Sequence, residues 1–303
     1  MPVLGRAGSS RGRQAGESVS DESSPPESAG TPDPRPGVVL VAVFAVGGVR
    51  FLEVVLGNVP ATGAPVWSTS SAALVGTVLV WSTIGESARS VPPPSTAARA
   101  LLVGGLAVAG VQAFAHSLQA GAVALGGTDP TVAVEGINPV TKTDSGLARY
   151  VLLGVCLTAV GEELLFRGAA LRAFEGRLSF HGANLAQAGL FGLWHLAWPL
   201  TLAVGPAEPP VALPVLALGT LLVTGLVGVV FGMLARATGT LWTPVLAHLV
   251  HNGVAVVVHV RAAGVDRAGV LSPALVLGYT LLAWLVWRRF EGPLFEGELF
   301  ETS

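Results

Sequence analysis

Charged residues are scarce in this chain: Asp, Glu, Lys and Arg make up only 12% of its 303 residues. A soluble domain typically carries about a quarter charged residues. With half that share, and with 51% of its residues hydrophobic, the chain has too little polar surface to face water on all sides. The composition therefore predicts that lipid covers much of the protein.

Cysteine and clustered basic residues are also scarce. The one cysteine, Cys156, excludes an internal disulfide and provides too few thiolates for a metal cluster. It lies in an apolar run, which favours a small buried side chain over a reactive thiol. The formal net charge is -2, and no basic field indicates a nucleic-acid partner.

What the chain has instead is a series of long apolar runs. Most contain ~20 residues, enough to cross a ~30 Å hydrocarbon core at 1.5 Å per residue. The sequence therefore predicts an all-α membrane protein, a bundle of about eight transmembrane helices without a soluble domain. The runs lie near residues 37–57, 67–85, 98–125, 148–170, 184–204, 211–234, 240–260 and 270–288.

Short segments are expected on either side of this transmembrane domain, which is predicted to span residues 37–290. Residues 1–36 are rich in Ser, Pro, Gly and acidic residues. Such a segment cannot bury enough apolar area to offset its chain entropy, so we expect a disordered tail. No apolar stretch follows its arginines within the window of a secretory signal peptide. The acidic tail 291–303 is expected to be solvated.

The distribution of basic residues predicts the orientation in the membrane. With eight helices and a cytoplasmic N-terminus, twelve arginines fall on the cytoplasmic side, against one lysine and three arginines outside. Basic residues are enriched in cytoplasmic loops. The pattern therefore predicts a multi-pass protein of the cell membrane with both termini in the cytoplasm.

Polar side chains within the apolar runs are informative, because each costs roughly 2.5–3.5 kcal/mol at membrane depth and usually faces a cavity or a partner. In the fourth run, Glu163 and Arg167 are four residues apart and can pair. Glu162 points elsewhere. Adjacent carboxylates repel each other at low dielectric, which suits general-base work. The alternative is an ordinary Glu–Arg pair at a helix end near the headgroups.

Histidines stand in two later runs. His195 follows Phe191 by four residues, although a lone histidine in a membrane helix also fits a hydrogen-bonded structural role. His248 and Asn252 are four residues apart, so they share a helix face and can direct two hydrogen-bond donors to one point. His251 points close by, where we expect a supporting or interhelical role.

Glu162, His195 and His248 are predicted to lie at one depth. The fourth helix runs inward, whereas the fifth and the seventh run outward. Counted from the cytoplasmic ends of these runs, all three residues lie ~12–17 Å deep at 1.5 Å per residue. Three helices thus place costly side chains in one slab of the membrane, which predicts a single site.

A carboxylate, an imidazole, and a second imidazole with an amide can together hydrolyse an amide bond with water. Glu162 can take the proton from a water molecule that His195 positions. His248 and Asn252 can donate hydrogen bonds to the tetrahedral oxyanion, whose loss typically costs ~3 kcal/mol. The sequence therefore predicts these four residues as the catalytic set.

Zinc is the competing interpretation of the same residues. Glu162, His195 and His248 could ligate it, although the chain has no His-Glu-x-x-His segment. We expect no cofactor. Glu163 and Arg167 are assigned a supporting role, in which their pair would hold the end of the catalytic helix in place.

Together these segments resemble the CPBP family, the CAAX-protease and bacteriocin-processing (Abi) membrane endopeptidases. The family pattern is Glu-Glu-x-x-x-Arg, then Phe-x-x-x-His, then His-x-x-x-Asn, each in a different membrane helix. The resemblance covers about residues 145–255, and no position departs from the pattern. The matching residues are Glu162, Glu163, Arg167, Phe191, His195, His248 and Asn252.

The resemblance implies the helical fold of the eukaryotic CAAX endoprotease and a glutamate-dependent attack by water. Glu162 and His195 would activate the water, and His248 and Asn252 would form the oxyanion hole. The implied partners are a membrane-associated peptide or protein substrate and the lipid bilayer. Because the family was earlier classed as metalloproteases, zinc stays open, and prenylated substrates do not transfer safely.

Two other functions also stay open. A catalytically silent membrane scaffold or bacteriocin-immunity protein would keep the fold, but it has no use for oxyanion donors. A proton-coupled transporter would favour internal repeats, and the chain has no convincing one. Arg50 and Glu53 in the first run are its only hint, and they fit a structural pair more simply.

Overall fold

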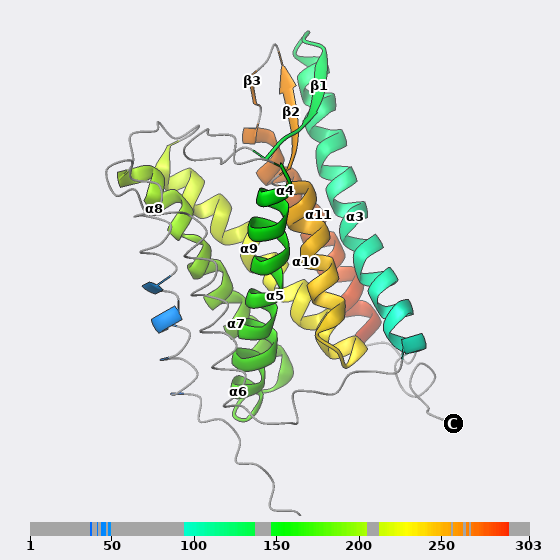
Figure 1. Ribbon diagram of the computed structural model, residues 1–303, viewed down its shortest axis with the longest axis vertical. Helices are drawn as coiled ribbons and strands as arrows, with labels where there is room; N and C mark the ends of the chain where they lie inside the picture. Colours follow the sequence, from blue (N-terminus) through cyan, green and yellow to red (C-terminus); the bar gives the residue numbers. More distant parts are fainter. Residues whose placement is uncertain are drawn as a thin grey trace, which may run out of the picture. The chain divides into compact units, whose positions relative to one another are not determined.

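The computed structural model describes residues 94–136, 147–204, 212–255, 257–262, 265–266 and 268–290, together with seven positions between 37 and 49. They belong to a unit that spans Asp33–Ser303, and most of them are helical, as the sequence predicts (Figure 1). The expected run 67–85 and the two expected tails, 1–36 and 291–303, lie outside the described residues.

Three of the predicted apolar runs correspond to single long helices. These are α3 (Pro94–Leu125), α9 (Leu213–Thr238) and α11 (Ala268–Phe290). α9 ends at Gly239, whose φ of 62° is a left-handed conformation that glycine adopts without a steric penalty. The length of an apolar run thus predicted these elements well.

The run predicted at 184–204 forms two helices instead of one. α7 (Phe180–His195) and α8 (Ala197–Val204) are separated by a turn at Leu196. α7 begins four residues earlier than predicted because Ser179 caps it: the Ser179 Oγ atom accepts a hydrogen bond from the Gly182 amide at 3.4 Å.

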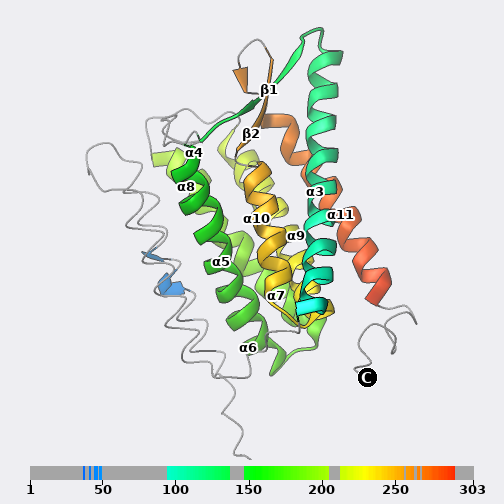
Figure 2. The same cartoon turned by 45° about the vertical axis from the view of Figure 1, so that its right-hand side comes forward.

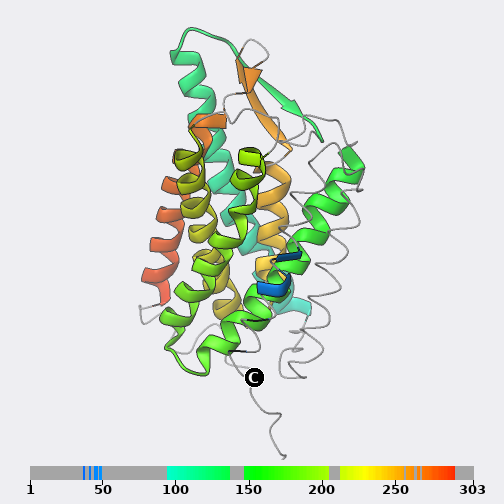
Figure 3. The same ribbon diagram turned by 90° about the vertical axis from the view of Figure 1, so that its left-hand side faces the viewer.

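The fourth predicted run, 148–170, is a composite helical segment. It consists of α4 (Leu147–Tyr150), the π-helical segment η3 (Val151–Leu157), α5 (Thr158–Glu163), the π-helical segment η4 (Leu164–Ala170) and α6 (Leu171–Glu175). Figure 3 shows this segment crossing beside α7 and α10. It ends at Gly176, where the chain turns into α7.

The helices pack around a shared apolar core. α9 contacts α7, α10 and α11, and α3 contacts α10 and α11 (Figure 2). Small residues let α7 and α9 approach closely: a Cβ atom at Gly228 would lie only 2.9 Å from the Ala188 Cα atom. Close packing of small residues is a common way for membrane helices to associate.

A small antiparallel sheet accompanies the helices, which make up most of the described residues. β1 (Pro130–Val134) pairs with β2 (Val258–Ala262), and β2 pairs with β3 (Val265–Asp266). The helix predicted at 240–260 therefore ends earlier, as α10 (Trp242–Ala255). The reason is the valine-rich chain after α10, because β-branched residues favour strands. Figures 1 and 2 show the sheet beside one end of α3.

Two of the described helices are long and apolar enough to cross a membrane. They are Leu102–Leu125 within α3 and Leu213–Thr238, and Pro273–Arg288 within α11 is a shorter apolar stretch. These helices and the helical fold agree with a membrane protein. The predicted total of eight transmembrane helices stays a prediction.

Candidate active site

The two adjacent carboxylates stand where the composite helical segment changes its winding. Glu162 and Glu163 end α5, which lies between the π-helical segments η3 and η4. π-helical turns are rare and occur frequently at functional sites. Both side chains are buried. Because successive helical residues point about 100° apart, the two carboxylates contact different neighbours.

Glu163 is paired with Arg167, as the sequence predicts. The Arg167 Nη1 atom donates a hydrogen bond to the Glu163 Oε1 atom at 2.8 Å. Neither side chain is exposed, so the pair is buried among the helices. The Glu163 and Arg167 charges stabilise each other, because a buried charge without a partner is strongly unfavourable.

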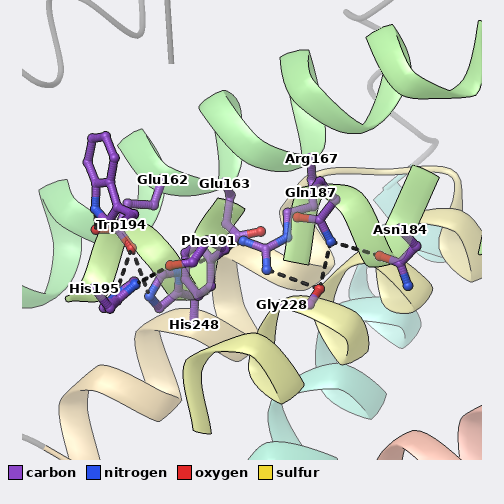
Figure 4. Close-up of polar contacts among 10 residues, drawn as sticks. All are labelled: Glu162, Glu163, Arg167, Asn184, Gln187, Phe191, Trp194, His195, Gly228 and His248. Atoms are coloured by element: carbon purple, nitrogen blue, oxygen red, sulfur yellow. Dashed lines mark hydrogen bonds and ion pairs between the residues drawn. The ribbon is translucent and has the colours of Figure 1, made fainter. Parts of the chain in front are cut away.

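The second guanidinium nitrogen of Arg167 binds a backbone carbonyl, that of Gly228, which the sequence did not predict (Figure 4). The Gly228 carbonyl accepts hydrogen bonds from Arg167 Nη2 at 3.2 Å and from Gln187 Nε2 at 2.9 Å. Gln187 Nε2 also donates to Asn184 Oδ1 at 2.8 Å. The guanidinium carbon lies 4.4 Å from the centre of the Phe191 ring, a cation–π distance. Asn184 and Gln187 could have been found from the sequence, because they are polar residues inside an apolar run.

Glu162 points toward the two predicted histidines. Its Oε2 atom lies 3.7 Å from the Nε2 atom of His195 and 3.7 Å from the Nε2 atom of His248. Its Oε1 atom accepts a hydrogen bond from the Trp194 indole N–H at 3.2 Å. Oε2 is buried and has no hydrogen-bond partner among the described residues. The structure thus brings together three of the four residues of the predicted set around one carboxylate oxygen.

The Nδ1 atoms of both imidazoles lie within hydrogen-bond distance of an acceptor oxygen. The Nδ1 atom of His195 lies 2.8 Å from the Phe191 carbonyl oxygen, which can only accept a hydrogen bond. The Nδ1 atom of His248 lies 2.7 Å from Oε1 of the Glu163 carboxylate. In the neutral rings both Nδ1 atoms therefore carry the hydrogen, and both Nε2 lone pairs face Glu162.

Three acceptor atoms consequently converge without a hydrogen between them. A water molecule can donate two hydrogen bonds, so it satisfies two of the three acceptors. The third acceptor needs another donor, because an unsatisfied buried acceptor is costly, and the neighbouring Asn252 amide is one candidate. A water molecule held between Glu162 Oε2 and the two imidazoles would therefore lie within reach of a carboxylate that can accept its proton.

The remaining residues of the third motif lie next to this group. The side chain of Asn252 hydrogen-bonds to His248. His251 contacts other helices instead: its Nδ1 atom lies 2.7 Å from Gln112 Nε2 on α3 and 2.7 Å from the Tyr279 hydroxyl on α11. The interhelical role predicted for His251 is confirmed.

The nitrogen and oxygen atoms of this group are also potential metal ligands. Within the described part of the chain, no group of three or more His, Cys, Asp and Glu side chains is arranged to hold a metal ion. The expected alternative set of Glu162, His195 and His248 does not meet that condition. The zinc alternative predicts that chelation abolishes activity and that Zn²⁺ restores it.

Comparison with known proteins finds a family match over part of the chain. Residues 144–254 match the family model described as "Type II CAAX prenyl endopeptidase Rce1-like". This segment, less than half of the chain, is therefore similar to that protease family. No curated protein and no solved structure matches the chain significantly.

The matched segment contains every residue of the predicted site. All three motifs, from Glu162 to Asn252, fall within the matched residues, whose bounds differ from the predicted stretch 145–255 by one residue at each end. The family is one of proteases, so the resemblance drawn from the three motifs is confirmed. The role of each side chain stays a proposal, which the geometry supports.

Proposed function

We propose that this protein is an intramembrane endopeptidase that hydrolyses a peptide bond of a membrane-associated peptide or protein with activated water. The observation that supports it best is the position of Glu162 Oε2, which is buried and faces the Nε2 atoms of His195 and His248 at 3.7 Å each. The match to a protease family supports the same reaction type.

In the proposed reaction, Glu162 is the general base. Its Oε2 atom takes one proton from a water molecule that hydrogen-bonds to His195 Nε2. The water oxygen forms a bond to the peptide carbonyl carbon, and the electron pair of the C=O double bond moves to the oxygen. Glu162 then gives its proton to the peptide nitrogen as the C–N bond breaks. Proton transfer of this kind typically contributes about 10²–10⁴-fold.

His248 and Asn252 are proposed to stabilise the oxyanion. The Asn252 amide can donate directly. Because the Nδ1 hydrogen of His248 is directed at Glu163, its Nε2 atom can donate only when the ring carries a second proton. In this proposal the second proton comes from solvent, and the Glu163 carboxylate stabilises the resulting imidazolium. His248 is therefore proposed as a charged donor.

We also propose a multi-pass location in the cell membrane, with both termini in the cytoplasm. The two membrane-length helices and the family support a membrane location. The excess of arginine in the predicted cytoplasmic segments supports the orientation. Labelling of single engineered cysteines from either side of intact cells, in a Cys156→Ala background, measures the orientation directly.

The catalytic proposal is tested with protein purified in detergent and a mixture of synthetic peptides, some with a prenylated C-terminus. Mass spectrometry identifies cleaved peptides. In H₂¹⁸O, the new carboxylate should carry ¹⁸O from the first turnover, because water attacks the carbonyl directly. Glu162→Ala and His195→Ala should abolish cleavage without unfolding the protein. A matched control is Glu175→Gln, which changes a partly exposed carboxylate at the end of the same helical segment.

Each result bears on one alternative. Full turnover by the Glu162→Ala variant would remove the proposed base. Turnover that survives exhaustive chelation would remove the zinc alternative, whereas loss on chelation and recovery with Zn²⁺ would require a metal mechanism. A folded wild-type protein that cleaves no peptide from any mixture would favour the silent scaffold.

A further inference from the structure

Trp194 contacts the carboxylate of Glu162 from the side opposite the histidines. Its indole Nε1–H donates to Oε1 at 3.2 Å. Among the described residues, the Trp194 indole is the donor to the Glu162 carboxylate, because the Oε2 atom of that carboxylate has no hydrogen-bond partner. Figure 4 shows the indole and the His195 ring on either side of the carboxylate. No motif of the family pattern includes this tryptophan.

The indole is a rigid donor because its ring is packed. Trp194 meets Phe166 edge to face, with ring centroids 5.6 Å apart and an interplanar angle of 86°. Phe166 is fully buried and packs in the same way against Phe191, at 5.0 Å. Phe166 belongs to η4, which begins two residues after Glu162. The aromatic contacts thus fix the direction of the N–H relative to the helix that carries the carboxylate.

Trp194 and His195 are consecutive residues that approach different oxygens of the same carboxylate. Trp194 binds Oε1, whereas His195 Nε2 lies 3.7 Å from Oε2. Without the indole, the carboxylate could rotate about its Cγ–Cδ bond and its side-chain torsions. The N–H removes that freedom and leaves Oε2 as the oxygen that faces both imidazoles.

We propose that Trp194 is a positioning residue for Glu162, which selects Oε2 as the oxygen that accepts the proton from water. The inference rests on the proposed function of Glu162 as the general base. An ordinary packing residue would need only the ring of the tryptophan. A positioning residue needs the N–H, and this difference makes the inference testable.

The first experiment separates the ring from the N–H. Trp194→Phe keeps an aromatic ring against Phe166 but lacks a donor. Benzothienylalanine at position 194 keeps the shape of the indole and replaces its N–H by sulfur, whereas 5-fluorotryptophan keeps the N–H. We expect kcat of peptide cleavage to fall at least about tenfold in the first two variants, with KM changed less than about twofold, and 5-fluorotryptophan to retain activity.

Trp242→Phe is the matched control. Trp242 is half exposed at the start of α10, and its replacement should leave kcat unchanged. If the benzothienylalanine variant keeps the wild-type kcat, the N–H is not needed and the inference is wrong. If benzothienylalanine and 5-fluorotryptophan at position 194 lower kcat equally, packing rather than hydrogen bonding explains the loss, and the inference is again wrong.

A second experiment does not depend on turnover. The chain has seven tryptophans, so indole N–H signals of ¹⁵N-tryptophan-labelled protein can be resolved by NMR. The Trp194 signal is the one that disappears in Trp194→Phe. It should move upfield in Glu162→Ala, because the charged acceptor is lost, and stay in place in Glu175→Gln. An unmoved signal in Glu162→Ala would overturn the hydrogen bond.

The two experiments separate failure of the inference from failure of the proposed function. If Glu162→Ala retains turnover, Glu162 is not the general base. The positioning role of Trp194 is then also wrong, even if its NMR signal moves. If Glu162→Ala is inactive but benzothienylalanine at position 194 is fully active, the proposed function stands and only the role of Trp194 is overturned.

Discussion

The Nδ1 atom of His248 lies 2.7 Å from the Glu163 Oε1 atom, between two side chains with 2% and 0% exposure. The same oxygen accepts a hydrogen bond from Arg167. Glu163 therefore joins the buried arginine to the histidine that faces Glu162. The two adjacent carboxylates therefore differ in their contacts. Glu162 faces the Nε2 atoms of both imidazoles, whereas Glu163 binds Nδ1 of His248 and so fixes the tautomer of that ring.

Glu163→Gln should lower kcat by at least about tenfold while KM changes little. The amide keeps the size of the side chain, but it removes the charge that stabilises a protonated His248. Peptide cleavage measured over a range of substrate concentrations separates the two constants. Glu175→Gln is the control for a neutralised carboxylate elsewhere on the segment. A Glu163→Gln enzyme with wild-type kcat would show that His248 does not need the charge.

Arg167→Met should destabilise the protein by about 3–5 kcal/mol, because it leaves the Glu163 carboxylate buried without its partner. The free energy of unfolding is measured in detergent by denaturant titration. Arg236→Met is the matched control: Arg236 is 60% exposed and lies 3.7 Å from Glu175, so its loss should cost only about 0–1 kcal/mol. Equal costs for the two variants would contradict the buried pair.

The double variant Glu163→Gln with Arg167→Met extends this test. Removing both charges should recover part of the stability that Arg167→Met loses, since no unpaired charge remains buried. Turnover should not recover, because His248 still lacks its carboxylate. A double variant as unstable as Arg167→Met alone would show that packing of the arginine, not its charge, carries the effect.

The sequence predicted the meeting of Glu162, His195 and His248 because periodicity and depth are local properties of each helix. It also predicted the Glu163–Arg167 pair, whose partners are one turn apart. It did not predict the contact between Glu163 and His248. That contact depends on the tilt and rotation of α10 against α5, and one sequence does not specify either quantity.

The small sheet was missed for a related reason. β1 and β2 are separated by more than a hundred residues, and Val132 is paired with Val260. Valine is frequent both in strands and in apolar membrane helices, so the run 240–260 fitted a single helix equally well. Only the partner strand, which is distant in sequence, decides between the two. Trp194 was also missed, because an indole within an apolar run fits simple packing.

Tyr279→Phe should lower stability while leaving turnover intact. The Tyr279 hydroxyl is fully buried and lies 2.7 Å from His251 Nδ1, so its removal should cost about 1 kcal/mol in the free energy of unfolding. Gln112 still contacts the same nitrogen. Because His251 joins α10 to α3 and α11 and does not face Glu162, kcat should stay within about twofold. A large loss of kcat at unchanged stability would assign His251 to the reaction.

Gly228→Ala should impair both stability and turnover, because this glycine lies where the backbones of α7 and α9 approach closely. The added Cβ would lie 2.9 Å from Ala188 Cα and 3.0 Å from Ala188 Cβ, and the helices would have to separate. Overpacking of this kind typically costs about 1–3 kcal/mol. The shift would also move the Gly228 carbonyl, which binds Arg167 and Gln187, so kcat should fall as well.

Gly189→Ala is the matched control for Gly228→Ala. Gly189 lies on α7, next to Ala188, and a Cβ there would meet nothing within 4 Å. Alanine has a higher helix propensity than glycine by up to about 1 kcal/mol, so this variant should be unchanged or slightly more stable. Thermal unfolding in detergent and peptide cleavage are measured for both variants. If Gly228→Ala matches Gly189→Ala in both measurements, the close approach of α7 and α9 does not position Arg167.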